Sequence, residues 1–253
     1  FRRLAAGGVA RAYREELGTA AGPHQFAVGR AGGAEIMQKA VAVAAEHRPH
    51  AVVMKFDFRN AYNSLTKPAA REGLAQAARA VLASHAVTLP DVAPTLASGV
   101  TTHWWVDAVG EVSPIKAERG VDQGCPMSPA LFALAIGPAL ARLASALRQL
   151  DPDALVFAYL DDVVVHIQAA HVEEAARLVA AEFSPLGLQL NARKTAVWGP
   201  DAGVQGYLPE ALRARWAFAM PVLGSALPYV RASYPEPEDM DPALEKPATQ
   251  RAV

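Results

Sequence analysis

The chain of 253 residues is nearly neutral and rich in apolar residues. Its 24 Lys and Arg against 25 Asp and Glu differ from the strongly basic balance typical of a small nucleic-acid-binding domain. The hydrophobic content of 52% is enough to form a buried core in one domain or two small lobes. The single cysteine, Cys125, excludes an internal disulfide and a cysteine-based zinc site.

Charge is distributed unevenly along the chain. Residues 1–59 carry nine Lys or Arg against five Asp or Glu, which is compatible with phosphate contacts. Residues 232–253 are acidic and rich in Pro, so we expect a disordered tail there. We see no signal peptide and no apolar run of membrane-spanning length, and we expect a nuclear or cytoplasmic protein that is neither secreted nor membrane-bound. Because the chain begins at Phe1, we interpret it as part of a longer polyprotein with flanking domains.

The predicted elements alternate helices with short apolar strands. Helical spacing of apolar residues, or a Pro at a first turn, predicts helices at residues 4–17, 35–46, 68–83, 129–150 and 171–183. β-Branched and aromatic runs predict strands at residues 51–56, 155–159, 163–167, 188–198 and 218–223, with a hairpin of residues 101–109 and 111–118 around Gly110. Residues 18–33 and 90–99 are predicted loops. This mixture predicts an α+β fold with a small, mostly antiparallel sheet and helices on one face.

Two adjacent carboxylates, Asp161 and Asp162, separate two of the predicted strands. A plain hairpin turn is one interpretation, since Asp is common in turns. However, tight two-residue turns favour Gly because they need positive φ, so Asp-Asp is poor turn chemistry. Like charges at a sheet edge repel one another and favour a bound cation. Mg²⁺ prefers carboxylate and phosphate oxygens, and two such ions can hold the attacking and leaving oxygens of an in-line displacement.

Asp57 is the candidate for a third metal-binding carboxylate. It follows the apolar run of residues 52–56, where a lone Asp is often only the N-cap of a following helix.

Two other patterns carry less weight. The glycines of residues 29–33 lack the full dinucleotide-binding pattern. Trp104 and Trp105 could stack on bases, but neighbouring strand residues face opposite sides, so core or interface packing is the favoured interpretation.

Five segments, in order, resemble the palm of a reverse transcriptase: residues 56–63, 120–129, 158–162, 186–195 and 222–224. The segment of residues 25–35 and the start at residues 1–4 resemble fingers motifs of the non-LTR retrotransposon type. The resemblance implies a polymerase palm with partial fingers, in which a small antiparallel sheet packs on helices. Residues 1–50 would be the partial fingers, residues 51–231 the palm with a primer-grip-like segment, and residues 232–253 the tail.

The resemblance also implies a metal site. Asp57 and Asp161 would bridge two Mg²⁺ ions, for which Mn²⁺ could substitute, and Asp162 would support them. The backbone carbonyl of Phe58 would be a further ligand. Lys194 would donate a proton to the leaving pyrophosphate, although a solvated surface lysine is the alternative.

Further residues would contact the nucleotide or primer. Tyr62 would lie under the sugar and exclude ribonucleotides, and its alternative is a core aromatic residue. Gln123 and Gly124 would border the incoming nucleotide, and Tyr159 would lie near the primer end. For Ser128 and the Pro that follows it, a helix N-cap and first helical residue are the favoured interpretation.

The implied function is RNA-directed DNA synthesis, using an RNA template, a DNA primer and dNTPs. One alternative is a catalytically inactive retroelement remnant that at most binds nucleic acid. Another is a different palm polymerase, such as an RNA-dependent RNA polymerase. Such enzymes tend to carry Gly before the Asp pair and a smaller residue than Tyr62 near the sugar.

Overall fold

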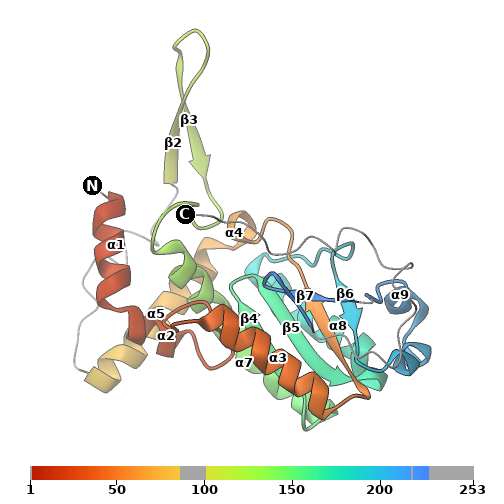
Figure 1. Cartoon of the computed structure of the whole chain (residues 1–253). Helices are drawn as coiled ribbons and strands as arrows, with labels where there is room; N and C mark the ends of the chain where they lie inside the picture. Colours follow the sequence, from red (N-terminus) through yellow and green to blue (C-terminus); the bar gives the residue numbers. More distant parts are fainter. Residues whose placement is uncertain (1, 86–100, 218, 228–253) are drawn as a thin grey trace, which may run out of the picture.

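A computed structural model describes residues 2–85, 101–217 and 219–227, and its centre is a four-stranded antiparallel sheet (Figure 1). The strand order is β4-β5-β1-β6. The strands are β1 (Ala51–Phe56), β4 (Leu155–Tyr159), β5 (Asp162–Gln168) and β6 (Ala196–Trp198). β1 pairs with β5 on one side and with β6 on the other, so the strand that precedes Asp57 is central. The predicted α+β class is confirmed.

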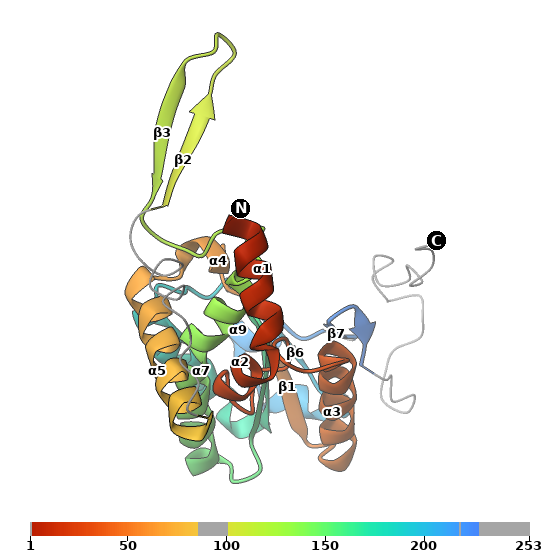
Figure 2. The ribbon, with the colours of Figure 1, turned by 90° about the vertical axis from the view of Figure 1, so that its left-hand side faces the viewer.

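Helices cover both faces of this sheet, whereas the sequence predicted helices on one face only. The first face packs against α7 (Ser128–Leu150) and α8 (Val172–Phe183), with α5 (Lys67–His85) outside α7. The second face packs against α3 (Gly33–His47), as Figure 2 shows from the side. This explains β1, whose run of apolar residues does not alternate: a central strand that is covered on both faces is apolar on both.

The two cores divide along the pleat of β1. Val52, Met54 and Phe56 belong to the core under α7 and α8. Val53 belongs to the core under α3, together with Met37 and Val41 of that helix. By the same alternation, Lys55 and Asp57 lie on the α3 side of the sheet.

The helix α7 is long and apolar enough by length and composition to cross a membrane, and 67% of its most apolar window is buried inside the protein. It contacts α2, α5, α8 and β4, so its composition matches a helix at the centre of a core. Ser128 does not cap it. The N-cap position is Met127, and the Ser128 hydroxyl donates to the carbonyl of Asp122 at 2.6 Å, so that it holds the preceding loop.

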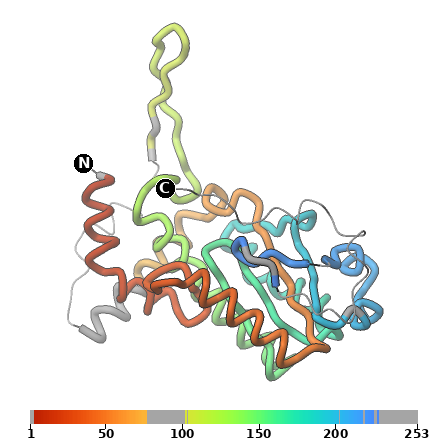
Figure 3. The backbone as a smooth tube through the Cα atoms, in the orientation of Figure 1, coloured from red at the N-terminus to blue at the C-terminus, as the bar shows by residue number. Residues whose placement is uncertain are grey.

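The N-terminal part differs from its prediction by one break. The single helix expected at residues 4–17 is two helices, α1 (Arg2–Ala12) and α2 (Arg14–Ala20), separated at Tyr13 with φ −109°. Leu17 of α2 is buried, and α2 contacts α5 and α7. The break lets α2 turn onto the core, a tertiary contact that the local pattern does not encode (Figure 3).

The predicted hairpin is present as β2 (Thr101–Val106) and β3 (Val112–Ala117), and it projects away from the rest of the protein (Figures 1 and 2). Trp104 is 67% exposed and Trp105 is 61% exposed, so packing in the core was wrong, whereas the alternative of interface packing stays a prediction. The large hydrophobic residues exposed on this ribbon are Trp104, Trp105, Val106, Val109, Val112 and Ile115.

The C-terminal third contains short elements. They are the 3-10 turns η1 (Ala169–His171), η2 (Ser184–Leu186) and η3 (Ala202–Tyr207), the helix α9 (Glu210–Arg213), and a hairpin of β7 (Pro221–Val222) and β8 (Ser225–Ala226). Of the strand expected at residues 188–198, only β6 and one bridge, Phe58 to Leu190, form, because a turn at Asn191 interrupts it. The predicted loop at residues 90–99 and the predicted tail at residues 232–253 lie outside the described residues.

Candidate active site

The hairpin of β4 and β5 presents the acidic pair, but not with both carboxylates in the turn. Tyr159 pairs with Asp162 across the strands, so the two turn residues are Leu160 and Asp161. Of these, Leu160 has positive φ, at 55°, as the first residue of a type II′ turn does. The strand predicted at residues 163–167 therefore begins one residue earlier, at Asp162, and of the acidic pair only Asp161 lies in the turn.

The strand register brings Asp57 to the same end of the sheet. Phe56 of β1 pairs with Val163 of β5. Continued by one residue, the antiparallel register places Asp57 opposite Asp162. Segments about a hundred residues apart in sequence that carry these carboxylates thus lie side by side where β1 ends, next to the short helix α4 (Ala61–Ser64) (Figure 1).

The charges at this end influence one another. Burial raises the pKa of Asp161, and the negative charges of Asp162 and Asp57 raise it further, while Lys194 lowers it. The Nζ atom of Lys194 lies 3.6 Å from Oδ1 of Asp57. Lys55, on the same side of β1, lies 3.4 Å from Oδ1 of Asp162. Two lysines therefore partly offset three carboxylates.

The donor chemistry fits a hard divalent cation, although the ligands are not assembled in advance. Within residues 2–85, 101–217 and 219–227, no three His, Cys, Asp or Glu side chains converge on one point that could hold a metal ion. Asp57 instead accepts a hydrogen bond from the Asn191 amide at 3.1 Å and contacts Lys194. Mg²⁺ usually takes one or two carboxylates and completes its shell with water and substrate phosphates, which this set can supply.

The side chain of Phe58 packs in the core. Its ring is buried against Phe183, with centroids 4.8 Å apart. Hydrogen bonds from Arg59 to Gln189 and from Asn191 to Asp57 flank its bridge to Leu190. In a pair of this kind the carbonyl of the central residue points away from the neighbouring strand. The Phe58 carbonyl therefore does not bond to residues 189–191, and its role as a metal ligand stays a prediction.

Tyr62 lies beside the acidic turn and also packs against the core. Its ring stacks on Phe132 with centroids 4.9 Å apart and planes inclined by 4°. Burial and the charges of Asp161 and Tyr159 raise the pKa of its hydroxyl to about 12. The two interpretations of Tyr62 are thus compatible, since one face of the ring packs on Phe132 and the residue remains half-buried next to Asp161.

The loop of residues 120–124 packs against Tyr62. The backbone N–H of Val121 donates to the Tyr62 carbonyl at 2.9 Å. A Cβ on Gly120 would lie 2.6 Å from that carbonyl, so only glycine fits there. Gln123 and Gly124 follow in the same loop, and the atoms nearest to a Cβ on Gly124 belong to Arg3 of α1, at 3.7 Å. Arg3 was missed in the sequence, where nothing local links it to residue 124.

The segment predicted to resemble a primer grip forms the hairpin of β7 and β8. Leu223 and Gly224 both have positive φ, at 50° and 87°, as in a type I′ turn. The Gln38 amide of α3 donates to the carbonyls of Val222 and Leu223 at 3.0 and 2.9 Å. Lys55 donates to the carbonyl of Pro221 at 3.4 Å, so one lysine links this hairpin to Asp162. Tyr159 is partly buried against the core under α3.

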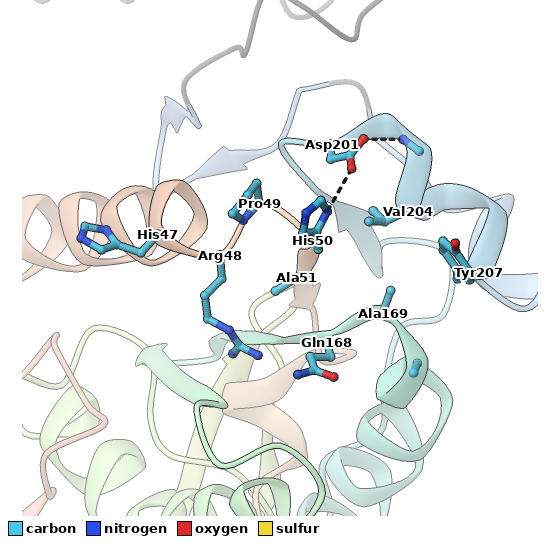
Figure 4. Close-up of a pocket in the computed structure, with 12 residues that line it drawn as sticks. His47, Arg48, Pro49, His50, Ala51, Gln168, Ala169, Asp201, Val204 and Tyr207 are labelled. Atoms are coloured by element: carbon cyan, nitrogen blue, oxygen red, sulfur yellow. Dashed lines mark hydrogen bonds and ion pairs between the residues drawn. The ribbon is translucent and has the colours of Figure 1, made fainter.

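A separate cavity of about 760 Å³ lies at the other end of the sheet (Figure 4). His50, Ala51, Gln168 and Asp201 are among its lining residues, and His50 contacts Asp201 at 3.2 Å. Ala51 begins β1 and Gln168 ends β5, so this cavity is opposite the end that carries Asp57 and Asp162. None of the predicted site residues lines it. In Figure 4 the rings of His47 and His50 lie apart, and only His50 is joined to Asp201.

Comparisons with known proteins bear on the family and the fold of the chain. Residues 20–207 match the family model "Reverse transcriptase (RNA-dependent DNA polymerase)". The fold is similar to telomerase from Candida albicans in complex with a fragment of telomeric RNA, with a TM-score of 0.65 and 14% identity over 88% of this chain. It is also similar to apo telomerase from Candida tropicalis, with a TM-score of 0.60 and 13% identity over 88% of this chain. The chain spans 38% of the length of each of these telomerase chains. Among curated proteins, no sequence matches.

Proposed function

Because the chain belongs to the reverse transcriptase (RNA-dependent DNA polymerase) family, we propose that it carries the nucleotidyl-transfer site of an RNA-directed DNA polymerase. Its substrates would be an RNA template, a DNA primer and dNTPs. One observation carries the proposal. The β1–β5 register and the β4–β5 turn bring Asp57, Asp161 and Asp162 to one end of the sheet.

The proposed chemistry uses two divalent cations, Mg²⁺ with Mn²⁺ as a substitute. Asp57 and Asp161 would hold both ions, with Asp162 and the Phe58 carbonyl as supporting ligands. The ions would lower the pKa of the primer hydroxyl and neutralise the phosphates of the nucleotide. The pKa of Asp161, raised first by burial and then by the charges of Asp162 and Asp57, supports this proposal, since a bound cation would offset both effects.

Lys194 and Lys55 would move between two sets of partners. Without a cation they contact Asp57 and Asp162. A cation at these carboxylates would release both lysines. Lys194, whose side chain is 68% exposed, could then reach the leaving pyrophosphate as a proton donor. Tyr62, Gln123 and Gly124 would border the nucleotide, and Tyr159 the primer end.

The chain would act as the core of a longer retroelement protein, of the non-LTR type. The length of the matched telomerase chains, of which this chain spans 38%, supports the presence of further domains in the whole protein. The telomeric RNA in the Candida albicans complex supports an RNA partner for the fold, and we extend that only to the template proposed here.

Primer extension on an RNA template tests this function. With Mg²⁺ present, Asp161→Asn should lower the extension rate by about 10³-fold or more, as expected for a group that acts within a catalytic unit. Asp201→Asn is the matched control, since Asp201 lies at the other end of the sheet and should leave the rate unchanged. The proposal would be refuted if the wild-type chain extended the primer equally well without Mg²⁺. It would also be refuted if Asp161→Asn left the extension rate unchanged. Duplex binding without any turnover would favour the inactive remnant.

A further inference from the structure

Gln25 has a fully buried side-chain amide that contacts the acidic turn of Leu160 and Asp161. Its side chain is 0% exposed. Its Oε1 accepts a hydrogen bond from the backbone N–H of Leu160 at 2.8 Å and a second from Ala27 at 3.2 Å. Leu160 directly precedes Asp161, so a side chain from the loop after α2 holds the backbone that carries a predicted metal ligand.

The segment around Gln25 is paired with β4 along its backbone. The N–H of Phe26 donates to the carbonyl of Ala158, and the N–H of Ala158 donates to the carbonyl of His24, both at 2.8 Å. These bonds form a parallel bridge between Gln25 and Ala158. The amide of Gln25 is thus fixed in register with the strand that leads into the turn.

Glycines hold this segment close to its neighbours. A Cβ on Gly33 would lie 1.8 Å from the Phe26 carbonyl. A Cβ on Gly29 would lie 2.5 Å from the Cα of Gly18. No other residue type fits at such distances, so the glycine-rich stretch brings backbones together next to Gln25. This gives a structural reason for the glycines that does not involve a phosphate.

The turn needs such support. A leucine at φ 55° is in a region that side chains with a Cβ rarely adopt. Two N–H donors face the Gln25 side chain, which fixes its oxygen toward them. Its Nε2 is then buried without a hydrogen-bond partner among the residues that the structure describes. An apolar side chain would avoid that unpaired donor, so the polar residue serves through its acceptor oxygen.

We propose that Gln25 is a positioning residue that fixes the turn of Leu160 and Asp161 in the geometry that binds the catalytic cations. The inference rests on the proposed function. Groups that orient metal ligands contribute to affinity although they do not touch the ion. Gln25 acts through the Leu160 backbone, and its loss should weaken cation binding and slow the reaction without changing nucleotide binding.

The test replaces Gln25 with Met, which has similar length and no amide oxygen. Three measurements follow on the full chain: amide hydrogen exchange at Leu160, Mn²⁺ affinity by electron paramagnetic resonance, and primer extension. Gln25→Met should raise exchange at Leu160 and weaken Mn²⁺ binding by about 10-fold or more. It should lower kcat by about 10–10²-fold with little change in KM for dNTP.

Phe26→Leu is the matched control. Phe26 shares the segment and packs on Phe157, but its side chain does not bond to the turn. It should lower stability without the change at Leu160 or in Mn²⁺ affinity. Unchanged Leu160 exchange and Mn²⁺ affinity in Gln25→Met, or equal losses in both variants, would overturn the inference. A wild-type chain without primer extension would refute the proposed function instead, while the exchange and Mn²⁺ measurements would still decide the role of Gln25.

Discussion

Tyr62 combines an observed packing contact with the selection against ribonucleotides proposed for it. The face that stacks on Phe132 fixes the ring, with planes inclined by only 4°. Its hydroxyl, with a pKa raised to about 12 by burial and by Asp161, remains neutral at any pH at which a polymerase is assayed. The ring is therefore a fixed, uncharged surface next to the acidic turn, as the proposed exclusion of a 2′-hydroxyl requires.

We expect Tyr62→Val to raise incorporation of NTP relative to dNTP by about 10–100-fold, the range for removal of one steric contact. Tyr62→Phe keeps the ring and should retain the selectivity of the wild type. Competitive primer extension with mixed dNTP and NTP measures the ratio. Equal selectivity in Tyr62→Val and the wild type would leave Tyr62 with its packing role alone.

At the scale of elements, close contacts between backbones position the site. α3 begins at Gly33, next to the Phe26 carbonyl, and covers the second face of the sheet. Through Gln38 the same helix holds the hairpin of β7 and β8. One helix thus connects the loop that carries Gln25 with the segment that resembles a primer grip.

Gly33→Ala should lower the free energy of unfolding by about 1–3 kcal/mol, because the new Cβ would overlap the Phe26 carbonyl and force a backbone shift. Gly8→Ala is the matched control. Gly8 lies in α1 with no atom within 4 Å of its Cβ position, and the change should stabilise the helix by about 0.5–1 kcal/mol. Urea denaturation compares the two variants. Similar effects of both would contradict the role given to Gly33.

At the scale of the whole molecule, the two ends of the sheet differ in how their charges are paired. The end with Asp57 holds charges that repel one another. The opposite end holds Asp151, which is 1% exposed and accepts two hydrogen bonds from the Nη2 atom of Arg48, at 3.0 and 2.9 Å. Burial acts to raise the pKa of Asp151, but bonds from Arg48 and from the backbone of Gln168 and Asp153 outweigh it, so the pKa is lowered.

Arg48→Met should lower the free energy of unfolding by about 3 kcal/mol at neutral pH, because it leaves a buried carboxylate without its cation. A group whose pKa is lowered by folding stabilises above its unfolded value, 3.8, and loses that effect as pH falls through the folded pKa. The difference between variant and wild type should therefore shrink below pH 3.8. Urea denaturation at neutral and acidic pH measures it, and a constant difference would refute the assignment. Primer extension at neutral pH should not change in the folded variant.

The sequence alone determined the elements with strong local signals. β1 and β4 have the predicted bounds, and α7 begins one residue earlier than expected, because long apolar runs and a helix-opening Pro encode them locally. The three candidate carboxylates were also singled out from sequence. Asp161 and Asp162 are adjacent between apolar strands, which conflicts with ordinary turn chemistry, and Asp57 follows another apolar run. The family resemblance supplied their order along the chain, and the family match confirmed that resemblance.

Only the tertiary structure decided which residues form the acidic turn and what supports it. The turn lies at Leu160 and Asp161 because the β4–β5 register pairs Tyr159 with Asp162. Gln25 reaches it from a position 135 residues earlier, and α3 covers a face that the pattern had left open. Register and long-range hydrogen bonds depend on which surfaces meet after the chain has folded, and no local periodicity encodes that choice.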